Sequence, residues 1–140
     1  MNLKRALIAG VVVAIVSAIF SMLTCGWLFN WVYLLEPTNI WKPMEEVSGM
    51  WYLWVNLGGL FNGIMLALVY ALLYKGIPGT GIVKGLWYGG LVWLIGMIPG
   101  MFATYTFMTV ATTAVIYWTV SGLFHYLLSG AIIGAIYKEG

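Results

Sequence analysis

The chain has 140 residues, of which 63% are hydrophobic and 7% are charged. A soluble domain carries about 25% charged residues, so this chain has too few charges to cover a surface that faces water. Its six Lys or Arg and four Glu residues fall at the ends of long apolar runs, as expected when a charge at the bilayer centre costs about 2.5 to 3.5 kcal/mol. Composition therefore excludes a soluble fold and predicts an all-α, polytopic membrane protein. The single cysteine, Cys25, excludes an intramolecular disulfide and a multi-cysteine metal site.

Four apolar segments are long enough to cross a membrane, and we expect them to form one transmembrane domain over residues 1–140. An α-helix rises 1.5 Å per residue, so about 20 apolar residues cross a hydrocarbon core of roughly 30 Å. The predicted helices span residues 4–31, 50–75, 82–103 and 114–138. In the first of them, Gly10, Ala14 and Ala18 are four positions apart, a spacing that lets a neighbouring helix approach closely.

The longest polar segment is the predicted exterior loop over residues 33–49. Two prolines within it argue against a continuous helix. Glu36, Glu45 and Glu46 lack the spacing of a calcium loop, so we expect them to be solvated, and we expect Trp41 to dip into the membrane surface. Long loops often carry function, so these four residues form a candidate partner-binding loop.

Two GxxxG pairs occur in the predicted helices, one at Gly59 and Gly63 and the other at Gly130 and Gly134. Small residues at this spacing let helix backbones pack closely inside a membrane. We therefore expect both pairs to serve helix packing rather than ligand binding.

The third predicted helix contains Pro99 and Gly100, which we expect to kink or end it. Residues 101–113 that follow are rich in threonine and are compatible with either a longer helix or an interfacial loop. The glycine-rich turn at residues 76–81 lacks the GxxxxGK[ST] spacing of a phosphate-binding loop, so we expect it to be a tight turn only.

The basic residues predict the orientation of the chain. Four spans place both ends of the chain on one side of the membrane, and the opposite side holds Lys42 with the three loop glutamates. The basic residues on the side of the termini are Lys4, Arg5, Lys75, Lys84 and Lys138. Because basic residues collect in cytoplasmic segments, we expect a plasma (inner) membrane protein with both termini in the cytoplasm.

Two segments of the chain share a pattern that indicates an internal repeat. One runs from Gly59-Leu60-Phe61-Asn62 to Tyr74-Lys75, and the other runs in the same register from Gly122-Leu123-Phe124-His125 to Tyr137-Lys138. The pattern predicts two helical hairpins of like orientation. The first hairpin is the longer one, because it contains the exterior loop.

His125 is the only residue of the apolar segments whose side chain titrates near neutral pH, and Asn62 takes its place in the other copy of the repeat. An ionisable group inside a membrane is a functional candidate, here as a proton site or as a haem or metal ligand. The alternative is a neutral, structural His125 that is hydrogen-bonded to a helix or to Asn62. We favour this alternative, because the chain has no second histidine and no carboxylate within the apolar segments. We therefore predict no cofactor, no metal site and no catalytic residue.

Several small and aromatic residues, mostly in the C-terminal half, form a recognisable set. They are Pro78-Gly79-Thr80-Gly81, Lys84-Gly85, Trp93, Pro99-Gly100, Tyr105, Met108, Trp118, Gly122-Leu123, Gly134 and Tyr137. The set resembles small prokaryotic four-helix integral membrane proteins of unassigned function. This resemblance implies the four-helix topology and no activity, so no site residue is carried over.

Three functions remain open. The favoured one is a non-enzymatic membrane protein that acts through helix and loop contacts, either as an accessory subunit of a membrane complex or as a homo-oligomer, with lipid around it and no nucleic-acid partner. The second is a small transporter or channel with a path near Asn62 and His125. The third is a haem- or quinone-associated redox subunit that uses His125.

Overall fold

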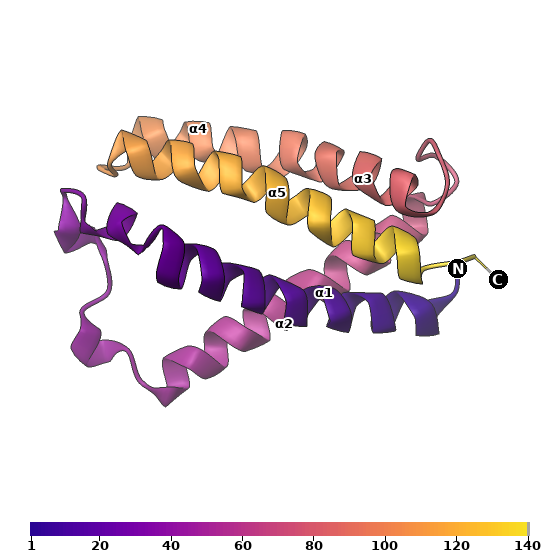
Figure 1. The fold of residues 1–140 in the computed structure, drawn as a ribbon, viewed down its shortest axis with the longest axis horizontal. Helices are drawn as coiled ribbons and strands as arrows, with labels where there is room; N and C mark the ends of the chain where they lie inside the picture. Colours follow the sequence, from indigo (N-terminus) through magenta and orange to yellow (C-terminus); the bar gives the residue numbers. More distant parts are fainter. Residues whose placement is uncertain (140) are drawn as a thin grey trace.

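The computed structural model describes residues 1–139, and every regular element in that range is helical. Four helical segments are long and apolar enough to cross a membrane, namely Leu3–Leu28, Gly49–Leu73, Gly81–Phe107 and Thr112–Ile136. The predicted all-α fold with four candidate spans is therefore confirmed. Both ends of the chain lie at the same end of the bundle (Figure 1); we call this the inner end and the opposite one the outer end.

The first span is the α-helix α1 (Leu3–Leu23) followed by a π-helical turn, η1 (Thr24–Leu28). The regular helix thus ends earlier than the expected residue 31. The Thr24 hydroxyl donates a hydrogen bond to the Phe20 carbonyl oxygen (2.8 Å), and such a bond competes with the backbone ladder of the helix. A 3₁₀ turn, η2 (Asn30–Leu34), follows.

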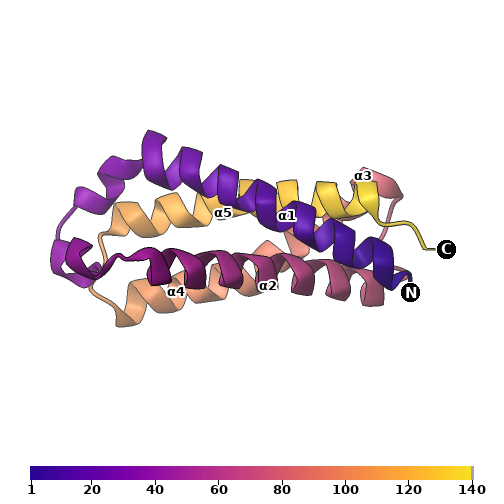
Figure 2. The ribbon, with the colours of Figure 1, turned by 90° about the horizontal axis from the view of Figure 1, so that it is seen from below.

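The exterior segment contains only two short 3₁₀ turns, η3 (Thr38–Ile40) and η4 (Met44–Glu46). The second span, α2 (Gly49–Leu73), begins directly after this segment. It crosses α1 obliquely (Figures 1 and 2), and its outer part diverges from the other helices (Figure 1).

The third span consists of α3 (Gly81–Val92), a π-helical turn η5 (Trp93–Met97) and α4 (Ile98–Phe107). The helix therefore does not end at Pro99, and it continues beyond the predicted residue 103 to Phe107. Proline lacks an N–H group and its ring clashes with the carbonyl four residues earlier, which belongs to Ile95 of η5. The wider π turn removes the regular bond at this place. The last span, α5 (Thr112–Ile136), begins after a short turn at residues 108–111.

Glycines mediate the closest contacts between helices. A Cβ atom added to Gly63 of α2 would collide with the carbonyl oxygen of Gly10 of α1. In the same way, Gly130 of α5 lies directly against the backbone of Gly85 of α3, and Gly134 lies against Gly81 and Gly85. Helix backbones can come this close only where no side chain separates them, and such packing is a main source of helix association in lipid.

Gly59, in contrast, does not pack against any helix among residues 1–139. No heavy atom lies within 4 Å of the position that its Cβ would take, and the same holds for Gly58. Ala18 of α1 is also exposed. The expected contact at Gly59 is absent because α1 and α2 cross at Gly10 and Gly63, so they separate towards the outer end (Figure 1).

Aromatic side chains join the helices at the inner end. The buried ring of Tyr70 on α2 lies 5.2 Å from that of Tyr88 on α3 and 5.7 Å from that of Tyr137, which follows α5. The Tyr88 hydroxyl donates to the Leu66 carbonyl oxygen (2.7 Å). The Lys84 ammonium is largely buried, donates to the Tyr74 carbonyl oxygen (2.6 Å) and lies over the Tyr74 ring. These contacts fix the inner half of α2 to the rest of the bundle.

We predict that Gly63→Leu and Gly130→Leu each destabilise the protein, because a side chain at either position must force two backbones apart. Overpacking typically costs about 1–3 kcal/mol. Thermal unfolding in detergent micelles measures the effect. Gly100→Leu is the matched control, since nothing lies near its Cβ position. Equal unfolding temperatures for all three variants and the unmodified protein would contradict this packing.

Candidate functional site

His125 lies in the middle of α5, and its side chain joins α5 to α1. The Nε2 atom is 2.8 Å from the hydroxyl oxygen of Ser17 on α1. The Phe20 and Tyr126 rings lie 5.7 Å and 5.3 Å from the imidazole. The other ring nitrogen makes no hydrogen bond within residues 1–139, so one polar atom of His125 remains available.

His125 lines a cavity of about 210 Å³ between α1, η5 and α5. Polar side chains gather there in an otherwise apolar membrane segment. Its polar lining residues are Ser21, Thr24, Cys25, Ser121 and His125, and its other lining residues are Phe20, Met97, Trp118, Gly122 and Tyr126. We call this space the His125 cavity.

Hydroxyl groups recur at helical spacing on both helices that form the His125 cavity. Ser17, Ser21 and Thr24 follow one face of the first span, and Tyr117, Ser121, His125 and Ser129 are each four residues apart on α5. Residues three or four apart lie on the same side of a helix. These two stripes were not predicted from the sequence, although their spacing is that of one helix face, and Ser17 was therefore not expected as the partner of His125.

Both π-helical turns of the membrane spans border the His125 cavity. The turn η1 contributes Thr24 and Cys25, and the turn η5 contributes Met97. Met97 packs against Gly122, where an added Cβ would lie 2.9 Å from the Met97 Cε. Single π turns in helices occur frequently at functional sites, so their position here supports the cavity as a site.

An aromatic cluster closes the outer end of this region. The Trp118 indole N–H donates to the Tyr33 hydroxyl (3.1 Å), and Cys25 Sγ lies 3.5 Å from the Tyr117 hydroxyl. Trp41 packs edge-on against Tyr33 and Trp118, at 5.2 Å and 5.8 Å between ring centroids. Trp41 therefore has ring partners within the chain. Its placement at the membrane surface stays a prediction. Burial raises the pKa of the Tyr33 phenol above its ordinary value, so Tyr33 stays neutral.

The structure does not bring Asn62 to His125. The Asn62 side chain is exposed on α2 and makes no hydrogen bond to any residue in the described range 1–139. Equal depth in two helices does not fix the direction in which each side chain points, and His125 bonds to Ser17 instead. The expected polar pair is therefore wrong, and a single path past both residues loses its main support.

The exterior loop neutralises part of its own charge. A carboxylate oxygen of Glu36 accepts a hydrogen bond from the Thr38 backbone N–H (3.1 Å), and the Lys42 ammonium lies 3.5 Å from a carboxylate oxygen of Glu46. Glu45 is exposed on the turn η4. The loop thus presents a solvated acidic surface.

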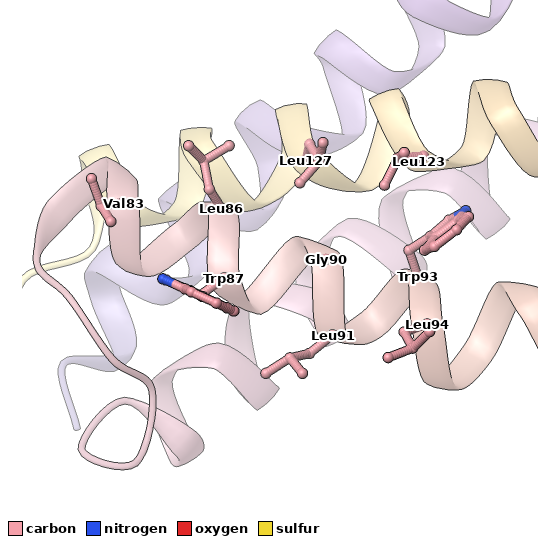
Figure 3. Close-up of a pocket in the computed structure, with 9 residues that line it drawn as sticks. All are labelled: Val83, Leu86, Trp87, Gly90, Leu91, Trp93, Leu94, Leu123 and Leu127. Atoms are coloured by element: carbon pink, nitrogen blue, oxygen red, sulfur yellow. The ribbon is translucent and has the colours of Figure 1, made fainter.

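A groove of about 500 Å³ on α3, η5 and α5 has a nearly wholly apolar lining (Figure 3). Figure 3 shows the side chains of Leu123 and Leu127 on α5 beside those of the third span. The Trp93 indole N–H is already occupied by the Thr119 carbonyl oxygen (2.9 Å). This groove offers a surface for lipid chains and no group for chemistry.

We predict that Ser17 and His125 are energetically coupled. In a double-mutant cycle of Ser17→Ala and His125→Phe, the hydrogen bond between them should appear as a coupling of about 0.6 kcal/mol, and at most about 1.7 kcal/mol. Unfolding of the four proteins in detergent measures this quantity. Strictly additive effects would mean that the two side chains do not interact.

Comparison with protein-family models, curated proteins and solved structures finds no match for this chain. The features that bear on function are therefore those of its own residues. They are the His125 cavity, which lies between helices of one chain, and the outer part of α2, which is exposed.

Proposed function

We propose that this protein acts through helix contacts inside the membrane, as a homo-oligomer, and that it is not an enzyme. The observation that carries the proposal is the exposed Asn62 amide in the middle of α2. Asn62 is 13 residues from one end of α2, Gly49, and 11 residues from the other, Leu73, so it lies near the centre of a span.

An unpaired amide is unfavourable in hydrocarbon. The Asn side chain has two N–H donors and one carbonyl acceptor, and each unsatisfied polar group in lipid costs several kcal/mol. Since no residue in the range 1–139 bonds to Asn62, a group outside the chain is needed. An amide can donate to and accept from an identical amide, so Asn62 of a second copy satisfies both groups across a twofold axis.

The surface around Asn62 is suited to a close helix contact. Gly58 and Gly59 lie about one turn away along α2, and no atom of the chain approaches their Cβ positions. On the other side of Asn62, the side chains of Met65 and Val69 are 37% and 41% exposed. Small residues next to a polar one are typical of helix interfaces in membranes.

An accessory subunit of a larger membrane complex is the related possibility, and the exterior loop supports it. Glu36, Trp41, Glu45 and Glu46 belong to a segment outside the spans. The exposed carboxylate of Glu45 has no salt bridge to any described residue. A partner with basic residues on its outer surface would complement this loop.

We also propose that the two hairpins are copies of one another. In the first, Gly63 lies against Gly10, and in the second, Tyr126 lies against Gly89. Tyr126 is the residue that the repeat aligns with Gly63. One of the close contacts of the second hairpin thus involves the stretch that is equivalent to the contact stretch of the first, which supports the repeat.

We place the protein in the plasma (inner) membrane with both termini in the cytoplasm. The basic residues Lys4, Arg5, Lys75 and Lys138 belong to the end at which both termini lie (Figure 1), whereas the acidic loop belongs to the outer end. This distribution is the one that cytoplasmic basic residues produce.

A topology assay tests this orientation. A reporter that is active only in the cytoplasm should be active when fused to the C-terminus, and the same reporter inserted in the loop after Pro43 should be inactive. A reporter that is active only outside the cytoplasm should give the opposite pattern. Activity of that second reporter at the C-terminus would contradict the proposed orientation.

The oligomer proposal predicts that Asn62→Leu weakens self-association. Loss of the two reciprocal amide hydrogen bonds, at about 0.6 kcal/mol each, corresponds to a roughly eightfold increase in the dissociation constant. Light scattering or sedimentation in detergent over a range of protein-to-detergent ratios measures the oligomeric state.

Asn56→Leu is the matched control, because the Asn56 amide already donates to the Tyr52 carbonyl oxygen of its own helix (2.8 Å). The control should associate as the unmodified protein does. Equal weakening by both substitutions would contradict a specific role of Asn62. A monomer at every ratio would contradict self-association, and co-purification of that monomer with another membrane protein would favour the accessory-subunit form.

A further inference from the structure

We propose that the His125 cavity binds the single-ring head group of a lipid-soluble quinone. This site does not depend on the proposed oligomer, because all the residues that line it belong to one chain. The chemistry of its lining, its size, its hydrogen-bonding groups and a neighbouring apolar groove each limit the kind of ligand that fits.

The lining requires a neutral ligand. The cavity contains hydroxyls, a thiol, an imidazole and aromatic rings, and no Lys, Arg or Glu side chain lines it. A charged head group would lose its hydration without gaining a counter-ion, which is strongly unfavourable in a membrane. Lipid phosphates and ammonium groups are therefore disfavoured.

The size of the cavity selects a single ring. A cavity of about 150 Å³ in another protein holds a benzene molecule, so the about 210 Å³ here is sufficient for one six-membered ring with small substituents.

The polar groups fit a ligand that accepts hydrogen bonds. The nitrogen of His125 that is not bonded to Ser17 is available, and the hydroxyl of Ser21 makes no hydrogen bond to other residues in the part of the chain that the structure describes. Hydroxyls are donors that rotate to suit a partner. Quinone carbonyl oxygens are acceptors, and the rings of Phe20 and Trp118 supply aromatic walls against which a flat ring packs.

A second groove adjoins the His125 cavity and suits the apolar tail of such a ligand. It has a volume of about 430 Å³ and shares Phe20, Thr24 and Ser121 with the cavity. Its other lining residues are Phe29, Trp31, Val32, Thr113, Ile116, Tyr117, Val120 and Phe124. Several of these side chains are exposed towards lipid, among them Ile116 (59%) and Phe124 (60%). A polar space for a head group thus lies next to an apolar space open to the bilayer.

Titration calorimetry with a decyl-substituted benzoquinone tests the proposal on the purified full-length protein in detergent. We expect saturable binding of one quinone per chain. Decylbenzene has a similar ring and tail without the carbonyl groups, so it should bind about tenfold more weakly, the difference that one or two hydrogen bonds produce. Equal affinity for the two probes, or no saturable binding of the quinone, would overturn the proposal.

Two substitutions in the cavity locate the site. His125→Phe removes a hydrogen-bonding group, and Ser21→Phe fills the cavity from an exposed position on α1. Each should weaken quinone binding about tenfold or more. Ala103→Phe adds the same bulk at an exposed position of α4 outside the cavity and should have no effect. If His125→Phe does not fold, the test depends on Ser21→Phe. A quinone affinity of Ser21→Phe equal to that of Ala103→Phe would overturn the assignment of the site.

Discussion

Close approach of helix backbones at glycine is the constraint on which the rest of this structure depends. In a bilayer, apolar side chains gain little by leaving lipid, so helices associate through tight packing and hydrogen bonds. Gly63 against Gly10 and Gly130 against Gly85 provide this packing. The two contacts determine which helices pair, and they also determine where the pairs separate. Because α2 is held at Gly63 and by the tyrosines at the inner end, its outer half is left without a partner in the described chain (Figure 1).

The exposed outer half of α2 explains why the polar groups of the membrane region lie in two different surroundings. Asn62 is the residue next to Gly63, yet it lies on another side of the helix and stays exposed. His125 faces α1, where Ser17 meets it. The two π turns widen the first and third spans at the borders of the same cavity. Polar groups of the membrane region are thus directed either into one cavity or outwards from α2.

The spans could be predicted from the sequence because length and hydropathy decide them, whereas the directions of side chains could not. A lipid-exposed helix and a buried one have similar composition, so the apolar pattern does not tell which face is covered. This is why the predicted pairing of Asn62 with His125 was wrong. Of the two outcomes predicted at Pro99, a kink or an end of the helix, the end did not occur, since the chain continues from a π turn into α4. The hydroxyl stripes through Ser17 and Ser121 could have been predicted, because a polar residue in every turn of an apolar helix marks one face.

Asn62 and His125 hold equivalent positions in the proposed repeat, and their different surroundings follow from the unequal hairpins. The fourth span follows a short turn, so α5 stays beside the third span and its polar stripe meets α1. The second span follows the long exterior segment, which lets the outer end of α2 stand apart. A polar residue at mid-membrane must find a partner, and a helix that stands apart offers none from its own chain. The longer loop therefore directs one of two similar polar positions outwards instead of into the chain. This difference separates the proposed ligand site at His125 from the proposed partner site at Asn62.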